Sequence, residues 1–192
     1  MNYPLTKKEK IAWDFAIERH HGQFRKFGNQ SYFDAHVRKV NGILKQITTN
    51  EDLLCASILH DVCEDCGVTY YEIDKIFGKK VADLVQELTS SDKKIGKMGK
   101  KNYLLTKMIN MSSDALLIKL CDRLQNISDH LTMSESFRKK YNEETRFIID
   151  NLVVARQLNR KHENIISQIN GILSRIDRGY KKKLKHLESF NR

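Results

Sequence analysis

Apolar residues recur at helical spacing along most of the chain, whereas the alternation typical of strands is nearly absent. The pattern predicts helices over about residues 6–27, 36–47, 51–66, 69–77, 79–88 and 142–189, with further helices beginning at 103 and 113. The last region is expected to form one long helix or two shorter ones. The helix over 51–66 and the one that Ser113 caps are apolar on nearly every side, which indicates burial. The sequence therefore predicts an all-α fold.

The chain is expected to form a single domain over residues 1–192. It contains one proline and nine glycines, and no stretch rich in Pro, Gly and Ser divides it. Helical periodicity fails over residues 92–101, which are rich in lysine and predict a mobile basic loop. Near the end of the chain, an apolar stripe predicts either packing or self-association into a homo-oligomer. It comprises Ile165, Ile169, Ile172 and Ile176.

The net charge of +10 at pH 7 indicates a surface that favours anions. Nucleic acid, an acidic membrane and a polyphosphate nucleotide would all be served by such a surface. The sequence contains no helix-turn-helix, zinc-finger or RNA-binding signature, so no specific nucleic acid is expected. Apolar runs are far shorter than the ~20 residues of a membrane span, and residues 1–10 show no secretory signal. We therefore expect a cytoplasmic protein without a membrane segment.

A histidine and three carboxylates stand together in the otherwise apolar helix over 51–66, as His60, Asp61, Glu64 and Asp65. Burying such groups without partners would cost several kcal/mol. A metal cation is the simplest way to satisfy a neutral imidazole and an adjacent carboxylate together. Helical spacing places Glu64 and Asp65 beside the metal rather than on it.

Two further residues are candidates for the same centre. Asp122 is a carboxylate among apolar neighbours in the other buried helix, and His36 opens a helix twenty-four residues before His60. A single buried histidine or aspartate is more often satisfied by a hydrogen bond in the core. The combination of His36, Asp122 and the pair at 60–61 favours a metal centre instead.

These residues follow the order H…HD…D, which resembles the ligand pattern of the HD phosphohydrolase superfamily. Four longer segments narrow the resemblance to the RelA/SpoT hydrolase domains. HHGQFRKFG at 20–28 resembles H-x-G-Q-x-R-K-x-G, and LHDVCED at 59–65 resembles L-H-D-V-x-E-D. FGKKVADLV at 77–85 resembles F-G-x-x-V-A-x-L-V, and IKLCDRLQN at 118–126 resembles I-K-L-A-D-R-L-x-N. The match covers about residues 12–130, and no synthetase-like region follows. The chain thus resembles the stand-alone small alarmone hydrolases.

The resemblance implies a helical bundle that holds one Mn²⁺, and a reaction that cleaves guanosine tetra- and pentaphosphate, (p)ppGpp, to GDP or GTP and pyrophosphate. The bound metal would acidify a water molecule and polarise the phosphate at the ribose 3′ oxygen. Glu64 and Asp65 would orient that water and handle its proton. The implied metal ligands are His36, His60, Asp61 and Asp122.

The resemblance also implies residues that bind the nucleotide. Arg25 and Lys26 match a pair that lies against the base, where a guanidinium can stack on a purine and a lysine serves as a point charge. Asn126 matches a polar residue that lines the nucleoside site. Lys97 resembles a basic position that meets phosphates in the small hydrolases, although a solvated loop lysine is an equal alternative.

Three departures from the family pattern leave part of this picture open. The family usually has P-Y-I-x-H-P ahead of the second helix, whereas residues 31–37 read SYFDAHV, without either proline and with one extra residue before His36. This change puts the direction of His36 in question. Cys66 replaces the usual Thr, and Gln125 replaces the usual His or Tyr. An alternative substrate is therefore another nucleotide, such as an adenosine alarmone or the 2′-phosphate of NADPH.

Overall fold

The computed structural model describes residues 4–25, 29–129 and 134–190, of which 180–190 are described as backbone only. The described residues are mainly helical, with one isolated antiparallel bridge between Phe24 and Ser31, and this confirms the all-α prediction. The elements are α1 (Lys7–Arg19), the π-helix η1 (Phe33–Val37), α2 (Arg38–Lys45), α3 (Glu51–Ile58), α4 (Val62–Asp65), α5 (Tyr70–Phe77), α6 (Lys79–Leu88), α7 (Asp92–Met98), α8 (Lys100–Asn110), α9 (Ser113–Ser128), α10 (Glu135–Ala155) and α11 (Arg160–Phe190).

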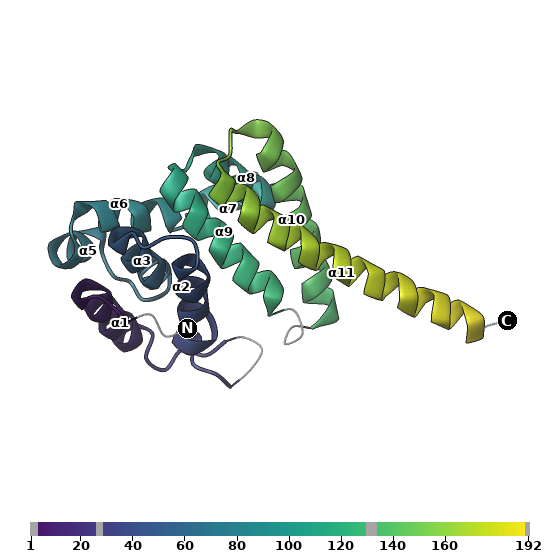
Figure 1. Cartoon of the computed structure of the whole chain (residues 1–192), viewed down its shortest axis with the longest axis horizontal. Coiled ribbons are helices and arrows are strands. Elements are labelled where there is room, and N and C mark those ends of the chain that lie inside the picture. Colours follow the sequence, from purple (N-terminus) through teal and green to yellow (C-terminus); the bar gives the residue numbers. More distant parts are fainter. Residues whose placement is uncertain (1–3, 26–28, 130–133, 191–192) are drawn as a thin grey trace.

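Helix α9 lies at the centre of the molecule. It contacts α2, α3 and α6 on one side and α10 and α11 on the other (Figure 1). Its apolar residues are buried around nearly its whole circumference, as its sequence predicts, and one continuous apolar core extends from Ala12 in α1 to Leu173 in α11. The hydroxyl of Ser112 accepts the Ala115 amide at the start of α9. Ser112 is therefore the cap, and the prediction of Ser113 was wrong by one residue.

Two predicted helices are interrupted near the centre of the fold. The helix expected over 6–27 ends at Arg19, because the chain turns at Gly22 with a φ of 77°, a conformation that favours glycine. The helix expected over 51–66 stops at Ile58, and α4 begins only at Val62. The break turns His60 and Asp61 out of the regular helical pattern.

The prediction of a loop over 92–101 was wrong. Ser91 precedes α7, Ile95 packs against the core, and Gly99 ends the helix with a φ of 75°. Lysines and an internal glycine leave this short helix with a single inward apolar position, which explains why no periodicity was visible in the sequence. The basic segment is thus helical over most of its length.

The C-terminal region forms two helices, the second of the two predicted alternatives, and the first begins at Glu135 rather than near 142. Arg156 adopts an extended conformation between them, and its guanidinium binds the carbonyl groups of Met108, Ile109 and Met111. Ile165 and Ile169 are fully buried, so this part of the predicted apolar stripe is used for packing within the chain. Self-association stays a prediction. The far end of α11 extends beyond the rest of the molecule (Figure 1).

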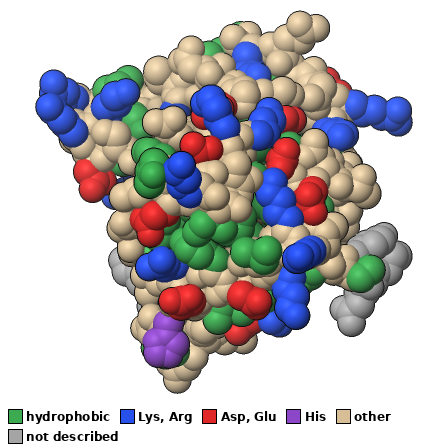
Figure 2. All heavy atoms as spheres, turned by 90° about the vertical axis from the view of Figure 1, so that its left-hand side faces the viewer, with side chains coloured by type: hydrophobic (Ala, Val, Ile, Leu, Met, Phe, Trp, Pro, Cys, Tyr) green, Lys and Arg blue, Asp and Glu red, His purple; other side chains and the backbone are tan. Residues whose placement is uncertain are grey.

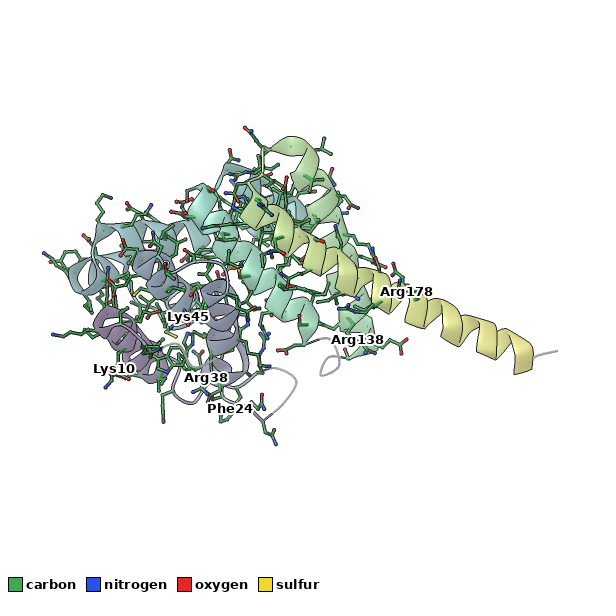
Figure 3. The ribbon with its side chains drawn as sticks, viewed as in Figure 1. Lys10, Phe24, Arg38, Lys45, Arg138 and Arg178 are labelled. Atoms are coloured by element: carbon green, nitrogen blue, oxygen red, sulfur yellow. The ribbon has the colours of Figure 1, made fainter. Side chains whose placement is uncertain are left out.

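The surface over α5 and α6 carries charges of both signs. Figure 2 shows lysines and arginines on this face interspersed with acidic side chains rather than gathered into one basic patch. On the inner side of the same half, Lys45 on α2 lies near α1 (Figure 3), where its Nζ is 3.0 Å from the buried Glu9. Among the described residues, none of the helices is both long enough and apolar enough to cross a membrane.

Candidate metal centre

The break between α3 and α4 brings His60 to the inside of the fold. Its ring is 2% exposed, and Nδ1 lies 2.8 Å from the carbonyl oxygen of Ser57, three residues earlier. A carbonyl only accepts hydrogen bonds, so Nδ1 carries the proton and Nε2 keeps its lone pair. The backbone of α3 thus fixes both the orientation and the tautomer of His60.

His36 reaches the same place from the π-helix η1. Its Nδ1–H donates to the side-chain oxygen of Gln125, and its Nε2 lies 3.3 Å from Nε2 of His60. The extra residue in this segment is accommodated by the wider turn of η1, in which the Arg38 amide donates to the Phe33 carbonyl five residues earlier. The departure from the family pattern therefore does not turn His36 away from the centre.

Two carboxylates complete the cluster. Oδ2 of Asp61 lies 2.9 Å from Nε2 of His60 and 3.5 Å from Nε2 of His36. Oδ1 of Asp122 lies 3.4 Å from Nε2 of His36. One potential ligand atom from each of His36, His60 and Asp122 lies within 4.8 Å of the others. Two imidazoles and two carboxylates form a donor set that suits a divalent transition metal, so the residues present fit such an ion.

The charges in the cluster favour a cation. Burial acts to raise the pKa of Asp122, but the neighbouring Lys119 ammonium, 2.7 Å away, and His36 hold that pKa far below its usual range. Burial likewise opposes ionisation of Asp61, and His60 and His36 lower its pKa well below the usual range. Both carboxylates are therefore ionised.

The same two carboxylates act on His36. Burial lowers its pKa, but Asp122 and Asp61 outweigh burial and raise the pKa to about 9. Nε2 of His36 therefore attracts a proton strongly, and the negative charge responsible attracts a metal ion in the same way.

Glu64 and Asp65 lie at the exposed rim of the centre. Asp65 is one helical turn beyond Asp61, with its amide 2.8 Å from the Asp61 carbonyl oxygen. Partial desolvation of the carboxyl group, followed by the charges of Asp61 and Glu64, raises the pKa of Asp65 to about 6. Oε2 of Glu64 accepts the amide of Ser90 at 2.8 Å, which connects α4 to the segment between α6 and α7. The rim thus holds an acid that can exchange a proton near neutral pH.

The sequence did not identify Tyr32 as a site residue. Its hydroxyl donates to Oδ2 of Asp61 at 2.6 Å, and burial together with the charge of Asp61 raises the pKa of Tyr32, so the phenol keeps its proton. Lys119 and Gln125 were also missed as partners of the centre. The only sequence signal was their position inside or beside the segments that resemble the family.

Two of the predicted nucleoside residues, Arg25 and Asn126, lie next to the metal centre. Nη2 of Arg25 is 2.6 Å from the side-chain oxygen of Asn126, whose amide donates to Oδ1 of Asp122 at 2.6 Å. The Arg25 guanidinium also faces the Tyr32 ring at 5.7 Å. Phe24, the neighbour of Arg25, lies at the outer edge of the molecule and is largely exposed (Figure 3).

For two predicted binding residues, the binding role stays a prediction. Lys26 lies outside the described residues. Lys97 is exposed on α7, and within the described part of the chain no hydrogen bond or ion pair connects it to the other predicted site residues. The proposed contact of Lys97 with phosphates stays a prediction.

An all-α fold that gathers two histidines and two aspartates around one buried point is the architecture of an HD domain. The chain belongs to the HD domain family, whose pattern matches residues 12–158. This confirms the family predicted from the sequence.

The relatives narrow the similarity further. The guanosine-3′,5′-bis(diphosphate) 3′-pyrophosphohydrolase MESH1 of Drosophila melanogaster is 35% identical over 129 residues, which are 66% of this chain and 71% of that protein. The guanosine-3′,5′-bis(diphosphate) 3′-pyrophosphohydrolase of Aquifex aeolicus is 35% identical over 153 residues, but the match covers only 21% of its length. A solved structure of a metazoan ortholog of SpoT that hydrolyses ppGpp superposes with a TM-score of 0.73 at 30% identity and covers 88% of this chain and 96% of that one.

Proposed function

We propose that the protein is a metal-dependent (p)ppGpp 3′-pyrophosphohydrolase that releases pyrophosphate and leaves GDP or GTP. The observation that carries this proposal is the convergence of His36, His60, Asp61 and Asp122 on one buried point, with Arg25 held beside it. The similarity to MESH1 and to a ppGpp-hydrolysing SpoT ortholog supports the choice of substrate. We further propose Mn²⁺ as the ion and the cytoplasm as the place of action.

His36, His60, Asp61 and Asp122 would hold the ion, which supplies Lewis acidity toward a phosphate oxygen and lowers the pKa of a bound water. The chain contributes the fixed Nε2 atoms of the two histidines and two ionised carboxylates, so little rearrangement is needed when the ion binds.

The rim carboxylates would perform the proton transfer. The pKa of Asp65, raised to about 6, leaves this group mostly ionised at neutral pH and still basic enough to accept a proton from an attacking water. Glu64 is held by the Ser90 amide and would help to orient the water. Both groups stand outside the buried donor set, as expected for residues that act on the water rather than on the ion.

Arg25, Lys26 and Asn126 would bind the nucleoside, and Lys97 would meet the phosphates. Arg25 supports this assignment because its guanidinium is already held over the Tyr32 ring and against Asn126, close to Asp122. A planar guanidinium in this position can stack on a purine and still donate hydrogen bonds in its plane.

The decisive experiment is a nucleotide panel with the purified protein, in Mn²⁺ or in EDTA. The panel contains ppGpp, its adenosine counterpart and NADPH, and released pyrophosphate and phosphate are measured separately. We expect pyrophosphate from ppGpp, lost in EDTA and in Asp122→Ala. Asp114→Ala is the matched control and should retain activity, because this aspartate at the start of the same helix forms an ion pair with Lys80 on the surface. Selective release of phosphate from NADPH would instead assign the alternative substrate, and no turnover in Mn²⁺ would refute the proposal.

A further inference from the structure

The two histidines of the centre are supported in different ways. His60 is held by a carbonyl of its own helix, three residues earlier in the chain. Nδ1 of His36 instead donates to Gln125, eighty-nine residues later in the chain. The orientation of His36 therefore depends on a side chain of α9.

Gln125 also binds the backbone that carries His36. Its amide nitrogen donates to the Ala35 carbonyl at 3.3 Å and to Oδ2 of Asp129 at 2.6 Å, and the side chain is 2% exposed. Both ends of the amide are thus used. The oxygen accepts from the His36 ring and, at 3.3 Å, from Nη2 of Arg25, and the nitrogen donates to the peptide group that precedes His36. The bonds to the His36 ring and the Ala35 carbonyl fix the ring and the backbone of η1 with one buried side chain.

The π-helical turn makes such support necessary. In a regular α-helix each residue advances the direction of the side chain by about 100°, so adding or removing one residue before His36 would turn its ring away from the centre. The wider turn of η1 absorbs the extra residue, and π-turns are rare and occur mostly as single turns within α-helices. A bond from a separate helix to the Ala35 carbonyl holds this turn in register.

We infer that Gln125 is the positioning residue for His36: through the His36 ring and the Ala35 carbonyl, it keeps the π-helical turn in the register that directs Nε2 to the metal centre. The inference rests on the proposed metal-dependent function. Among the described residues, no hydrogen bond joins Gln125 to His60, Asp61 or Asp122. Its other contact in the site is with Arg25, a proposed nucleoside residue, so we infer that its effect on the ion passes through His36. Outer hydrogen-bond partners of this kind typically change metal affinity by about 10–100-fold.

The first test replaces Gln125 by Leu, which is similar in size and lacks both hydrogen bonds. Mn²⁺ affinity is measured without nucleotide by titration calorimetry, and the ring proton on Nδ1 of His36 is followed by NMR in the metal-free protein. We expect Mn²⁺ binding to weaken by about 10–100-fold and the His36 resonance to be lost, while the His60 resonance stays. Ser128→Ala is the control on α9, because the Ser128 hydroxyl donates to the Leu124 carbonyl of its own helix. Unchanged Mn²⁺ affinity in Gln125→Leu would overturn the inference.

The second test separates positioning from general loss of structure. Asp34 is exposed in η1, and its deletion removes one residue from the π-helical turn. The deletion restores the spacing of the family pattern and should turn η1 into a regular helical turn, so we expect Mn²⁺ binding to stay near the wild-type value. In this background Gln125→Leu should weaken Mn²⁺ binding less than it does alone, because a regular turn needs less support from α9. Fully additive effects in this double-mutant cycle would contradict the inference. Because both tests read Mn²⁺ affinity, they remain valid if the wild-type protein binds Mn²⁺ and does not hydrolyse ppGpp, a result that would refute the proposed function alone.

Discussion

Buried histidines from other parts of the chain pack near α9 in two regions, one near its start and one near Asp122. The histidines of the two regions use their ring nitrogens differently. Near the start of α9, His162 donates from Nε2 to the Ser113 carbonyl at 2.9 Å and accepts the Asn159 amide on Nδ1 at 3.3 Å. Near Asp122, His36 and His60 each use Nδ1 on the protein and turn Nε2 toward carboxylates. All three rings are equally buried. The direction of the second nitrogen, rather than burial, distinguishes a structural histidine from a candidate ligand.

The largest expected difference between these regions is in activity. His60→Ala removes a proposed ligand and should lower pyrophosphate release from ppGpp by about a thousandfold or more, because several kcal/mol of transition-state stabilisation depend on the ion. His162→Gln should stay within about threefold of the wild-type rate, since it loses only a hydrogen bond worth about 1 kcal/mol to folding. Steady-state kinetics of ppGpp hydrolysis by both variants tests this prediction. Equal losses of activity in His60→Ala and His162→Gln would contradict it.

The rim acids should differ from the buried ligands in the way they lose activity. Asp65→Asn should lower kcat by about 10²–10⁴-fold, the usual contribution of a general base, while Mn²⁺ affinity stays near the wild-type value. Calorimetry with Mn²⁺ alongside kcat separates the two effects. If Asp65→Asn lost Mn²⁺ binding as His60→Ala is expected to do, Asp65 would belong to the ligand set instead.

Metal binding should stabilise the fold through the region around Asp122 and not through the region around His162. At an Mn²⁺ concentration of about 100 times its Kd, the wild-type protein should gain about 2.7 kcal/mol in the free energy of unfolding. His162→Gln should show the same gain, whereas Asp122→Ala should show almost none. Thermal unfolding with Mn²⁺ and with EDTA measures these differences. A gain of equal size in Asp122→Ala would place the ion elsewhere.

The smallest effect concerns pH. Burial lowers the pKa of His162 below its ordinary value of 6.5, which means that the unfolded chain takes up a proton before the folded protein does. The contribution of neutral His162 to stability is therefore complete above about pH 6.5 and is lost as the pH falls below it. The free energy of unfolding should fall less steeply between about pH 7.5 and about pH 5.5 in His162→Gln than in the wild-type protein. Parallel curves from denaturant titrations would contradict this.

The sequence predicted the helical fold because helical periodicity is a local signal. It also pointed to His60, Asp61 and Asp122, which stood out as polar groups in apolar segments. Tyr32 and Gln125 could not be identified in this way, since their partners lie twenty-nine and eighty-nine residues away in the chain. The break after Ile58 was hidden for a related reason. Its apolar flanks continue a helical pattern, and only the position of His60 in the folded protein shows why the helix stops.

A single helix, α9, carries Asp122, Gln125 and Asn126 within about one turn, while η1 and the break before α4 carry the two histidines and Asp61. The centre is therefore formed where α9 packs against η1 and the segment between α3 and α4. A slide of α9 along its axis would move one carboxylate, the support of His36 and the partner of Arg25 by the same amount and in the same direction. Substitutions in the packing between α2 and α9 would accordingly lower ion affinity and nucleoside affinity together, even where the substituted residue contacts neither the ion nor the nucleoside.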